Sequence, residues 1–236
     1  MKDQGSLCTW NKDKVLKLFS ILAQMYSIDI NEFAISIANH AKTNFFEILV
    51  AIILSQNTND KNAVNAFNNL KTAMGVIPPQ KIINIDDEEL KVLIRVAGLI
   101  NRKTKALKEL ATIIIEKPEF FDKLMHLDVE EARKKMLELP GVGHKTADVF
   151  LLMVLRKPTF PIDTHINRVV RRLGIASLKD TYEVIRARIL DYLGYDVEKL
   201  IEFHLLLIMH GRKTCKARNP LCTQCLVFNT CCRVLE

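Results

Sequence analysis

The feature that most constrains this chain is a short turn inside an otherwise helical pattern, Leu139-Pro140-Gly141-Val142-Gly143-His144-Lys145. Pro140 ends the preceding periodic run, because proline has no amide hydrogen and clashes with a helix interior. Gly141 and Gly143 permit the positive φ angles that a tight turn needs. Lys145 then opens an apolar helix. The segment therefore predicts two helices joined by a hairpin turn.

This predicted hairpin has the properties of a phosphate site. Successive backbone N–H groups and the positive end of a helix favour an anion, so Gly141 and Gly143 are candidate DNA contacts. The same positive end disfavours a protonated Lys145, and a lysine nucleophile must be partly neutral near pH 7. Glycine-rich hairpins also occur as DNA-contacting modules without chemistry, so the hairpin alone leaves both roles open.

A candidate partner for the lysine is Asp163. It follows Pro161 and precedes a helical run of Ile166, Val169, Val170 and Leu173. At this position its side chain would cap the helix and remain ionised at the positive helix end. A carboxylate opposite a lysine forms a catalytic pair, although most aspartates before helices are only caps.

The cysteines cluster at the C-terminal end. Cys215, Cys222, Cys225 and Cys231 have the spacing C-x6-C-x2-C-x5-C, with Cys232 directly after them and Cys8 far away. Such clustering predicts metal or cluster ligation rather than a disulfide framework. Four thiolates suffice for one tetrahedral zinc ion or one iron–sulfur cluster, and the presence of only one closely spaced pair favours the cluster.

Together these segments resemble the endonuclease III family of helix-hairpin-helix DNA glycosylases, from Leu139–Ala147 through Ile162-Asp163-Thr164-His165 to the cysteines. In that family the lysine at the position of Lys145 is the Schiff-base nucleophile, and the aspartate at the position of Asp163 is the second catalytic residue. Branches that remove mispaired adenine or thymine carry serine or tyrosine at the lysine position, so the resemblance implies a bifunctional glycosylase and AP lyase.

The resemblance also implies a [4Fe–4S] cluster. The cysteine spacing, preceded by His210-Gly211-Arg212-Lys213-Thr214, is similar to the family's cluster motif. Replacing Cys231 with Cys232 would lengthen the last spacing to six, so Cys231 is the expected fourth ligand. Lys213, Lys216 and Arg218 lie near the first ligand, where they would neutralise DNA phosphates or simply be solvated.

Two further loops resemble the family's DNA-probing loops. After Leu54, a run of amides could fill the gap left by an extruded base or could cap helices. The family has a glutamine in this turn, but ungapped alignment places Asn57 there and Gln56 one position earlier. Leu99 matches the apolar residue that wedges beside the flipped nucleotide, although a lone loop leucine is usually part of a core.

The rest of the chain predicts an all-α fold. Helical spacing is clear, and Thr112–Ile115 reads as helix because the period continues on both sides. We expect a short helix from Asn31 to Ile37, an Asp180 cap and a helix end at Gly211. By resemblance, residues 38–157 form a six-helix domain, residues 1–37 and 158–236 form a second domain with the cluster, and the catalytic cleft lies between them.

Composition supports an anionic partner. The 236 residues are 49% hydrophobic and carry a formal net charge of +7. No apolar run reaches the length of a membrane span, and the N-terminal residues do not resemble a secretory signal, so we expect a soluble intracellular monomer.

The combined prediction is a base excision repair enzyme that acts on double-stranded DNA. It would remove damaged, oxidised pyrimidines through a Lys145 imine and nick the strand by β-elimination, also at abasic sites. The alternatives are a mismatch-specific glycosylase for uracil or thymine opposite guanine, a non-catalytic hairpin protein, and a redox carrier.

Overall fold

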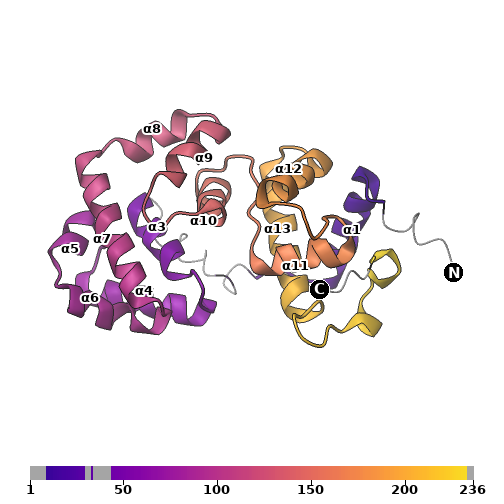
Figure 1. Ribbon diagram of the computed structural model, residues 1–236, viewed down its shortest axis with the longest axis horizontal. Coiled ribbons are helices and arrows are strands. Elements are labelled where there is room, and N and C mark those ends of the chain that lie inside the picture. The colour runs from indigo at the N-terminus through magenta and orange to yellow at the C-terminus, as the bar shows by residue number, and fades with distance from the viewer. Residues whose placement is uncertain (1–8, 30–32, 34–43, 233–236) are drawn as a thin grey trace. The chain divides into compact units, whose positions relative to one another are not determined.

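The computed structural model of the protein describes residues 9–29, 33 and 44–232 (Figure 1). Within these residues the regular structure is entirely helical, which confirms the predicted all-α class. The expected helix from Asn31 to Ile37, the proposed boundary at residue 38, and Cys8 lie outside the described residues. None of the described helices is long and apolar enough to cross a membrane.

The chain divides into two compact units, Met1–Ile28 with Arg156–Glu236, and Asp29–Leu155. The domain limits predicted from the sequence stay a prediction. The unit Asp29–Leu155 contains ten helical elements in its described part: α3 (Phe45–Leu54), α4 (Asp60–Met74), α5 (Pro79–Asn84), α6 (Asp87–Ile94), the 3-10 turn η2 (Arg95–Ala97), α7 (Ile100–Glu116), α8 (Phe120–His126), α9 (Val129–Leu137), α10 (His144–Val149) and the π-helical turn η3 (Phe150–Val154).

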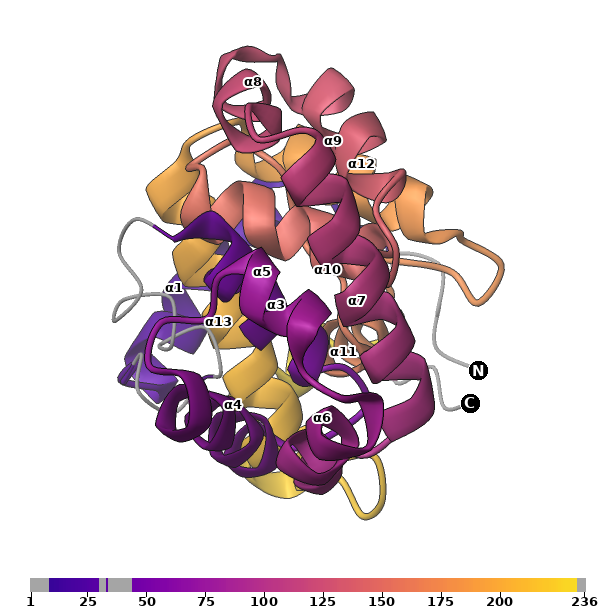
Figure 2. The same cartoon turned by 90° about the vertical axis from the view of Figure 1, so that its left-hand side faces the viewer.

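Helix α3 is the centre of this unit. Every residue from Phe46 to Leu54 is buried, as its nearly all-apolar sequence predicts. Helices α4 and α7 pack against it, and α7 also packs on α5 and α6 (Figures 1 and 2). Phe45, Phe121 and Phe150 form an aromatic cluster, with ring centroids 5.7 to 6.1 Å apart. Burial of this surface is the main stabilising contribution.

The second unit contains α1 (Lys12–Met25), α11 (Thr164–Leu173), α12 (Tyr182–Leu193) and α13 (Val197–Lys213), followed by the 3-10 turns η4 (Cys222–Gln224) and η5 (Phe228–Thr230). Helices α11 and α13 pack against each other, and α1 packs on α12 and α13 (Figure 1). The predicted helix end at Gly211 is wrong, because α13 continues to Lys213. Gly211 serves helix packing instead, since a Cβ there would lie 2.8 Å from the Cβ of His165 on α11.

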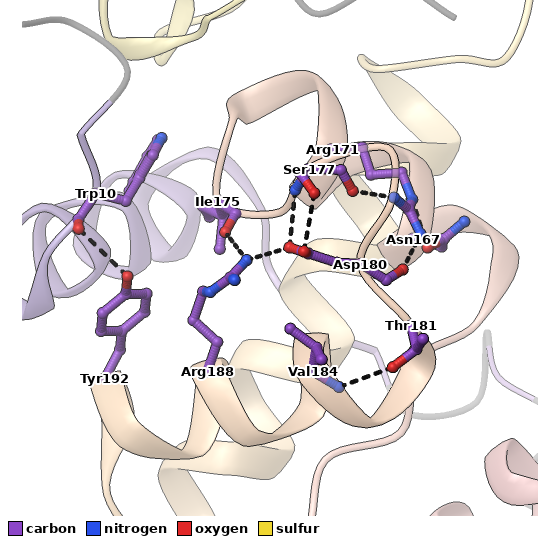
Figure 3. Close-up of polar contacts among 10 residues, drawn as sticks. All are labelled: Trp10, Asn167, Arg171, Ile175, Ser177, Asp180, Thr181, Val184, Arg188 and Tyr192. Carbon is purple, nitrogen blue, oxygen red and sulfur yellow. Dashed lines mark hydrogen bonds and ion pairs between the residues drawn. The ribbon is translucent and has the colours of Figure 1, made fainter.

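The predicted cap at Asp180 is also wrong. Thr181 caps α12 by accepting the Val184 N–H, whereas Asp180 turns back and accepts the N–H and hydroxyl of Ser177 at 2.9 and 2.8 Å (Figure 3). Its carboxylate also pairs with Arg188. These bonds lower the pKa of Asp180 to about 2, the Ser177 N–H first and Arg188 second. The carboxylate therefore closes the loop before α12 instead of starting the helix.

Candidate functional site

The predicted hairpin is present between α9 and α10. Gly141 has φ +75°, and a Cβ there would lie 2.8 Å from the Cβ of Ala106, so both the backbone and the space require glycine. The Val142 N–H donates to the Leu139 carbonyl at 3.1 Å, which closes the turn. The expectation of positive φ at Gly143 is wrong: its φ is −99°, and it precedes α10 as an extended cap residue.

Gln56 holds this hairpin from the neighbouring loop. Its side-chain amide donates to the Gly141 carbonyl at 2.7 Å and to the Thr146 hydroxyl at 3.0 Å. This one side-chain amide therefore bonds both the hairpin and the first turn of α10 to the loop that follows α3. Sequence reasoning identified Gln56 as a candidate DNA contact and did not identify this bond, because the two segments are 85 positions apart.

A buried ion pair fixes the other side of α10. Arg133 on α9 donates to Asp148 through Nε at 2.6 Å and through Nη2 at 3.1 Å, and Asp148 is fully buried. The same guanidinium lies 3.4 Å from His144 Nδ1. A two-bond arginine–carboxylate pair sets direction as well as distance, so α10 cannot rotate about its axis without breaking it. An aspartate inside an apolar helix was the available sequence signal.

Lys145 is the second residue of α10 and is half-buried. Asp163 is half-buried too, and it caps α11 by accepting the Ile166 N–H at 2.7 Å, as predicted. Lys145 belongs to the unit Asp29–Leu155 and Asp163 to the other unit, so their pairing stays a prediction.

Neighbouring His165 is a partner of Arg168, whose Nη2 lies 3.2 Å from Nδ1. Burial is the main reason that the pKa of His165 is lowered.

The two candidate DNA-probing loops each expose one side chain on a left-handed backbone. Asn57 has φ +53° and Leu99 has φ +48°. Leu99 is 49% exposed, so it is not a core residue. Asn57 is exposed, and its side chain makes no hydrogen bond within the described part of the chain. The helix-capping role predicted as an alternative belongs to Asn59, which accepts the Asn62 N–H at 2.9 Å.

Sequence reasoning did not predict that Lys103 is buried. Only 2% of it is exposed, and its ammonium donates to the carbonyls of Leu54 and Ala97, both at 2.8 Å. Burial lowers the pKa of Lys103 to about 8. The helical spacing of α7 puts this position on the same face as Leu107 and Leu110, which is the one signal available in the sequence.

The four predicted cysteine ligands line one cavity of about 230 Å³. All four are free thiols. Cys232 does not line the cavity, and its side chain occupies the place of a Cβ on Gly174. Across the described residues, no group of three or more His, Cys, Asp or Glu side chains meets the geometry of a single-metal site. Burial raises the pKa of the Cys225 thiol, and the three other thiols raise it further.

Two arginines of α11 hold the start of the cysteine loop. Arg168 donates from Nε to the Cys215 carbonyl at 3.0 Å, and Arg172 donates to the carbonyls of Lys216 and Ala217 at 2.7 and 3.1 Å. Arg172 Nη1 also lies 3.7 Å from the sulfur of Cys215. Helix α11, which Asp163 caps, is thus bonded directly to the loop.

A histidine completes the wall of the cavity. His210 is buried, and burial lowers its pKa to about 4, so the ring is neutral at pH 7. Its Nδ1 lies 2.9 Å from the Tyr26 hydroxyl, and its Nε2 lies 3.9 Å from the sulfur of Cys225. Outside the cavity, Lys213, Lys216 and Arg218 are exposed.

Comparison with known proteins agrees with this geometry. Residues 50–194 match the family described as "HhH-GPD superfamily base excision DNA repair protein". Endonuclease III of Sulfolobus acidocaldarius is 39% identical over 219 residues, covering 91% of this chain and 94% of that protein.

Solved structures show the same architecture. A trapped endonuclease III–DNA covalent intermediate has a TM-score of 0.76 at 26% identity and covers 94% of this chain and 96% of its own. A thermostable thymine-DNA glycosylase has a TM-score of 0.72 at 20% identity, with 93% and 94% covered, and shows the fold alone. The chain belongs to the HhH-GPD superfamily of base excision DNA repair proteins, and within it to the endonuclease III family of DNA glycosylases and AP lyases.

Proposed function

We propose that the protein removes oxidised pyrimidines from double-stranded DNA and nicks the resulting abasic site, with Lys145 as the nucleophile and Asp163 as its carboxylate partner. The observation that carries this proposal is that contacts on two sides hold α10, the helix of Lys145, in place. Gln56 fixes the hairpin turn from one side, and the Arg133–Asp148 pair fixes the helix from the other. A nucleophile must be held in one geometry to react, and Lys145 lies in the first turn of the helix that these contacts fix.

The proposed reaction begins with a neutral Lys145 amine. Nζ bonds to C1′ of the damaged nucleotide, the N-glycosidic bond breaks, and the base leaves with its electron pair and a proton. Asp163 stabilises the positive charge that develops on the sugar. The C1′–O4′ bond then breaks, O4′ takes a proton, and the lysine nitrogen and C1′ form an imine. Loss of a proton from C2′ expels the 3′ phosphate by breaking the C3′–O bond, and water hydrolyses the imine to release the enzyme. A solved endonuclease III–DNA covalent intermediate supports a covalent route for this family.

We further propose that the protein binds DNA as a monomer and uses three groups of contacts. The backbone at Gly141 and Gly143 would bind one phosphate at the hairpin. Asn57 and Leu99 would enter the duplex beside the extruded nucleotide, which fits their exposure. Gln56 is assigned to the hairpin, because its amide is already bonded there.

The basic residues of the cysteine loop form the third group. Lys213, Lys216 and Arg218 are exposed, so charge reversal at any of them should reduce the salt slope of binding by about one unit for each lost phosphate contact. An unchanged slope would assign these side chains to solvent.

Cys215, Cys222, Cys225 and Cys231 would hold a [4Fe–4S] cluster. The fit rests on this chain's donor set: four thiols around one cavity of about 230 Å³, which has room for a group much larger than one ion. The other three thiols help to raise the pKa of Cys225, and a positive centre would relieve the repulsion among the four when they become thiolates. The group would supply four bonds that hold residues 215–231 together. Because Arg168 and Arg172 bond the start of this loop, a loop held by the group would in turn help to fix α11.

The decisive experiment is borohydride trapping. Duplex DNA with thymine glycol, and duplex DNA with an abasic site, are incubated with protein and borohydride, which reduces a lysine imine to a stable amine. Wild type should become covalently attached to DNA, and Lys145→Gln should abolish the adduct while binding persists. Lys135→Gln is the matched control, since Lys135 is an exposed lysine of α9.

Two further arms define the roles. Asp163→Asn keeps a side chain that can cap α11 and removes the charge, so base release should slow by roughly 10²- to 10³-fold with normal binding. Trapping that survives in Lys145→Gln would assign the chemistry to another amine. Release of thymine or uracil opposite guanine without trapping would favour a mismatch-specific, monofunctional enzyme.

A further inference from the structure

Lys103 lies where two helical elements end. Its ammonium donates to the Leu54 carbonyl, the last residue of α3, and to the Ala97 carbonyl, the last residue of η2, both at 2.8 Å. Carbonyls at a helix C-terminus lack an intrahelical partner and carry partial negative charge. One ammonium group therefore bonds the C-terminal carbonyls of two helical segments that are more than 40 positions apart in the sequence.

Each of these exit points leads directly into a candidate DNA-probing loop. Leu54 is followed by the turn that carries Asn57, and Ala97 is followed by Gly98 and Leu99. Asn57 and Leu99 both hold a left-handed backbone, which asparagine tolerates and which costs leucine about 1–2 kcal/mol. Such conformations persist only where the surrounding structure determines them. The Lys103 ammonium is bonded to the residue that precedes each of these loops.

The burial of this ammonium is costly. Within the described residues no carboxylate lies within ion-pair distance of it, and burial alone lowers its pKa. A buried charge without a countercharge usually stabilises a fold less than an apolar side chain of similar size. Stability alone therefore gives no reason for a lysine at this position.

We propose that Lys103 is a positioning residue that holds the two DNA-probing loops in one fixed relation, so that Asn57 and Leu99 enter the duplex together. Lys103 itself contacts no DNA in this proposal. The inference rests on the proposed function, in which those two side chains accompany extrusion of the damaged nucleotide. Pre-organised groups bind without the additional entropic cost of being ordered, so a fixed loop pair favours extrusion.

The test compares two steps that differ in their need for extrusion. Lys103→Met keeps an unbranched apolar chain and removes the ammonium. We expect single-turnover release of thymine glycol to fall about tenfold or more, since small misplacements near a reacting centre have effects of this size. Strand nicking at an abasic site, where no base must be extruded, should change less than about threefold. Lys105→Met, an exposed lysine two positions along the same helix, should alter neither rate.

The outcomes separate the two proposals. If wild type forms no borohydride adduct with either duplex, the proposed function fails, whatever Lys103 does. If wild type forms the adduct and Lys103→Met lowers both rates equally or leaves both unchanged, the positioning role is refuted. Helical circular dichroism and the urea unfolding midpoint check that each variant is folded.

A measurement on wild type covers the case in which Lys103→Met does not fold. The Gln56 and Gly98 amides each donate a hydrogen bond, to Ile53 and Arg95 at 3.2 Å. A shared anchor predicts that both amides open in one event, with hydrogen-exchange protection factors within about threefold of each other. The Gly75 amide, bonded to Lys71 in the same unit, reports an independent loop. Protection factors for Gln56 and Gly98 that differ more than tenfold would refute the shared anchor.

Discussion

The hairpin before Lys145 and the cysteine loop after α13 are organised in opposite ways. Side chains from three other segments converge on the hairpin: Ala106 fills the space beside Gly141, Gln56 bonds its carbonyl, and Arg133 pairs with a buried aspartate of α10. The cysteine loop is bonded to α11 mainly through its own backbone carbonyls, and its thiols surround a cavity. The hairpin is fixed by packing and hydrogen bonds, whereas the cysteine loop would, in the proposed function, gain further support from a group that bonds its thiols.

This difference separates two requirements of a repair glycosylase. The hairpin leads into Lys145, the proposed nucleophile, and the contacts that fix it all come from the chain itself. The cysteine loop presents basic residues at the surface, and a centre bound by its thiols would join its two ends in addition to its own backbone hydrogen bonds. Substitutions in the hairpin and substitutions in the cysteine loop should therefore have distinct consequences.

The largest effect should follow loss of a cysteine ligand. Cys222→Ser should remove the broad visible absorption of an iron–sulfur protein and destabilise the unit that contains α11 and α13 by several kcal/mol. Hydrogen exchange of the Val142 and Ala147 amides, which close the hairpin and start α10, should change little.

Thr223→Ser is the control for absorption, because Thr223 is exposed beside Cys222 and does not line the cavity. A colourless wild type with one equivalent of zinc would replace the cluster proposal with a zinc site. Loss of hairpin protection in Cys222→Ser would contradict the independence of the two regions.

The next largest effect is expected within the hairpin itself. Gly141→Ala should destabilise the protein by about 2–4 kcal/mol, because alanine is strained at φ +75° and its methyl would overlap Ala106. Gly143→Ala should cost less than about 1 kcal/mol, since its φ is −99° and nothing lies within 4 Å of an added Cβ. Urea unfolding measures both, and equal losses would show that the hairpin depends on its local turn rather than on packing.

Substitutions at the adjacent side-chain amides of Gln56 and Asn57 should distinguish support of the hairpin from contact with DNA. Gln56→Ala should cost about 1–2 kcal/mol of unfolding free energy, because the Gly141 carbonyl and the Thr146 hydroxyl lose their donor. Asn57→Gly keeps the left-handed backbone and should leave stability within about 0.5 kcal/mol, while slowing release of thymine glycol. The reverse pattern, a stable Gln56→Ala with slow excision, would exchange the two roles.

The smallest effect is expected at the ion pair between Asp180 and Arg188, which closes the loop before α12. Asp180 has a folded pKa of about 2 against an ordinary 3.8, so its contribution is complete above about pH 5 and is lost as the pH falls from 4 toward 2. Asp180→Asn should therefore cost about 1–2 kcal/mol at pH 7, and most of the difference from wild type should be gone at about pH 2 (Figure 3). A difference that stays constant with pH would mean that packing, not ionisation, holds the loop before α12.

The sequence by itself determined the class of structure and the kind of chemistry. Helical spacing correctly predicted the all-α class and a helix through Thr112–Ile115, because this signal acts within a few residues. The hairpin string, Asp163 as a cap and the cysteine spacing are local patterns too. Their resemblance to the endonuclease III family correctly predicted the family to which the chain belongs.

Only the tertiary structure decided which side chains support the site. Gln56 and Asn57 are adjacent amides, yet one bonds a turn 85 positions away and the other is exposed. Lys103 reads as a surface lysine and is buried against two helix ends. Gly211 was predicted to end a helix, but it lies inside α13, where that helix packs closely against His165 of α11. Each role depends on a contact between distant segments, and local propensity carries no information about such contacts.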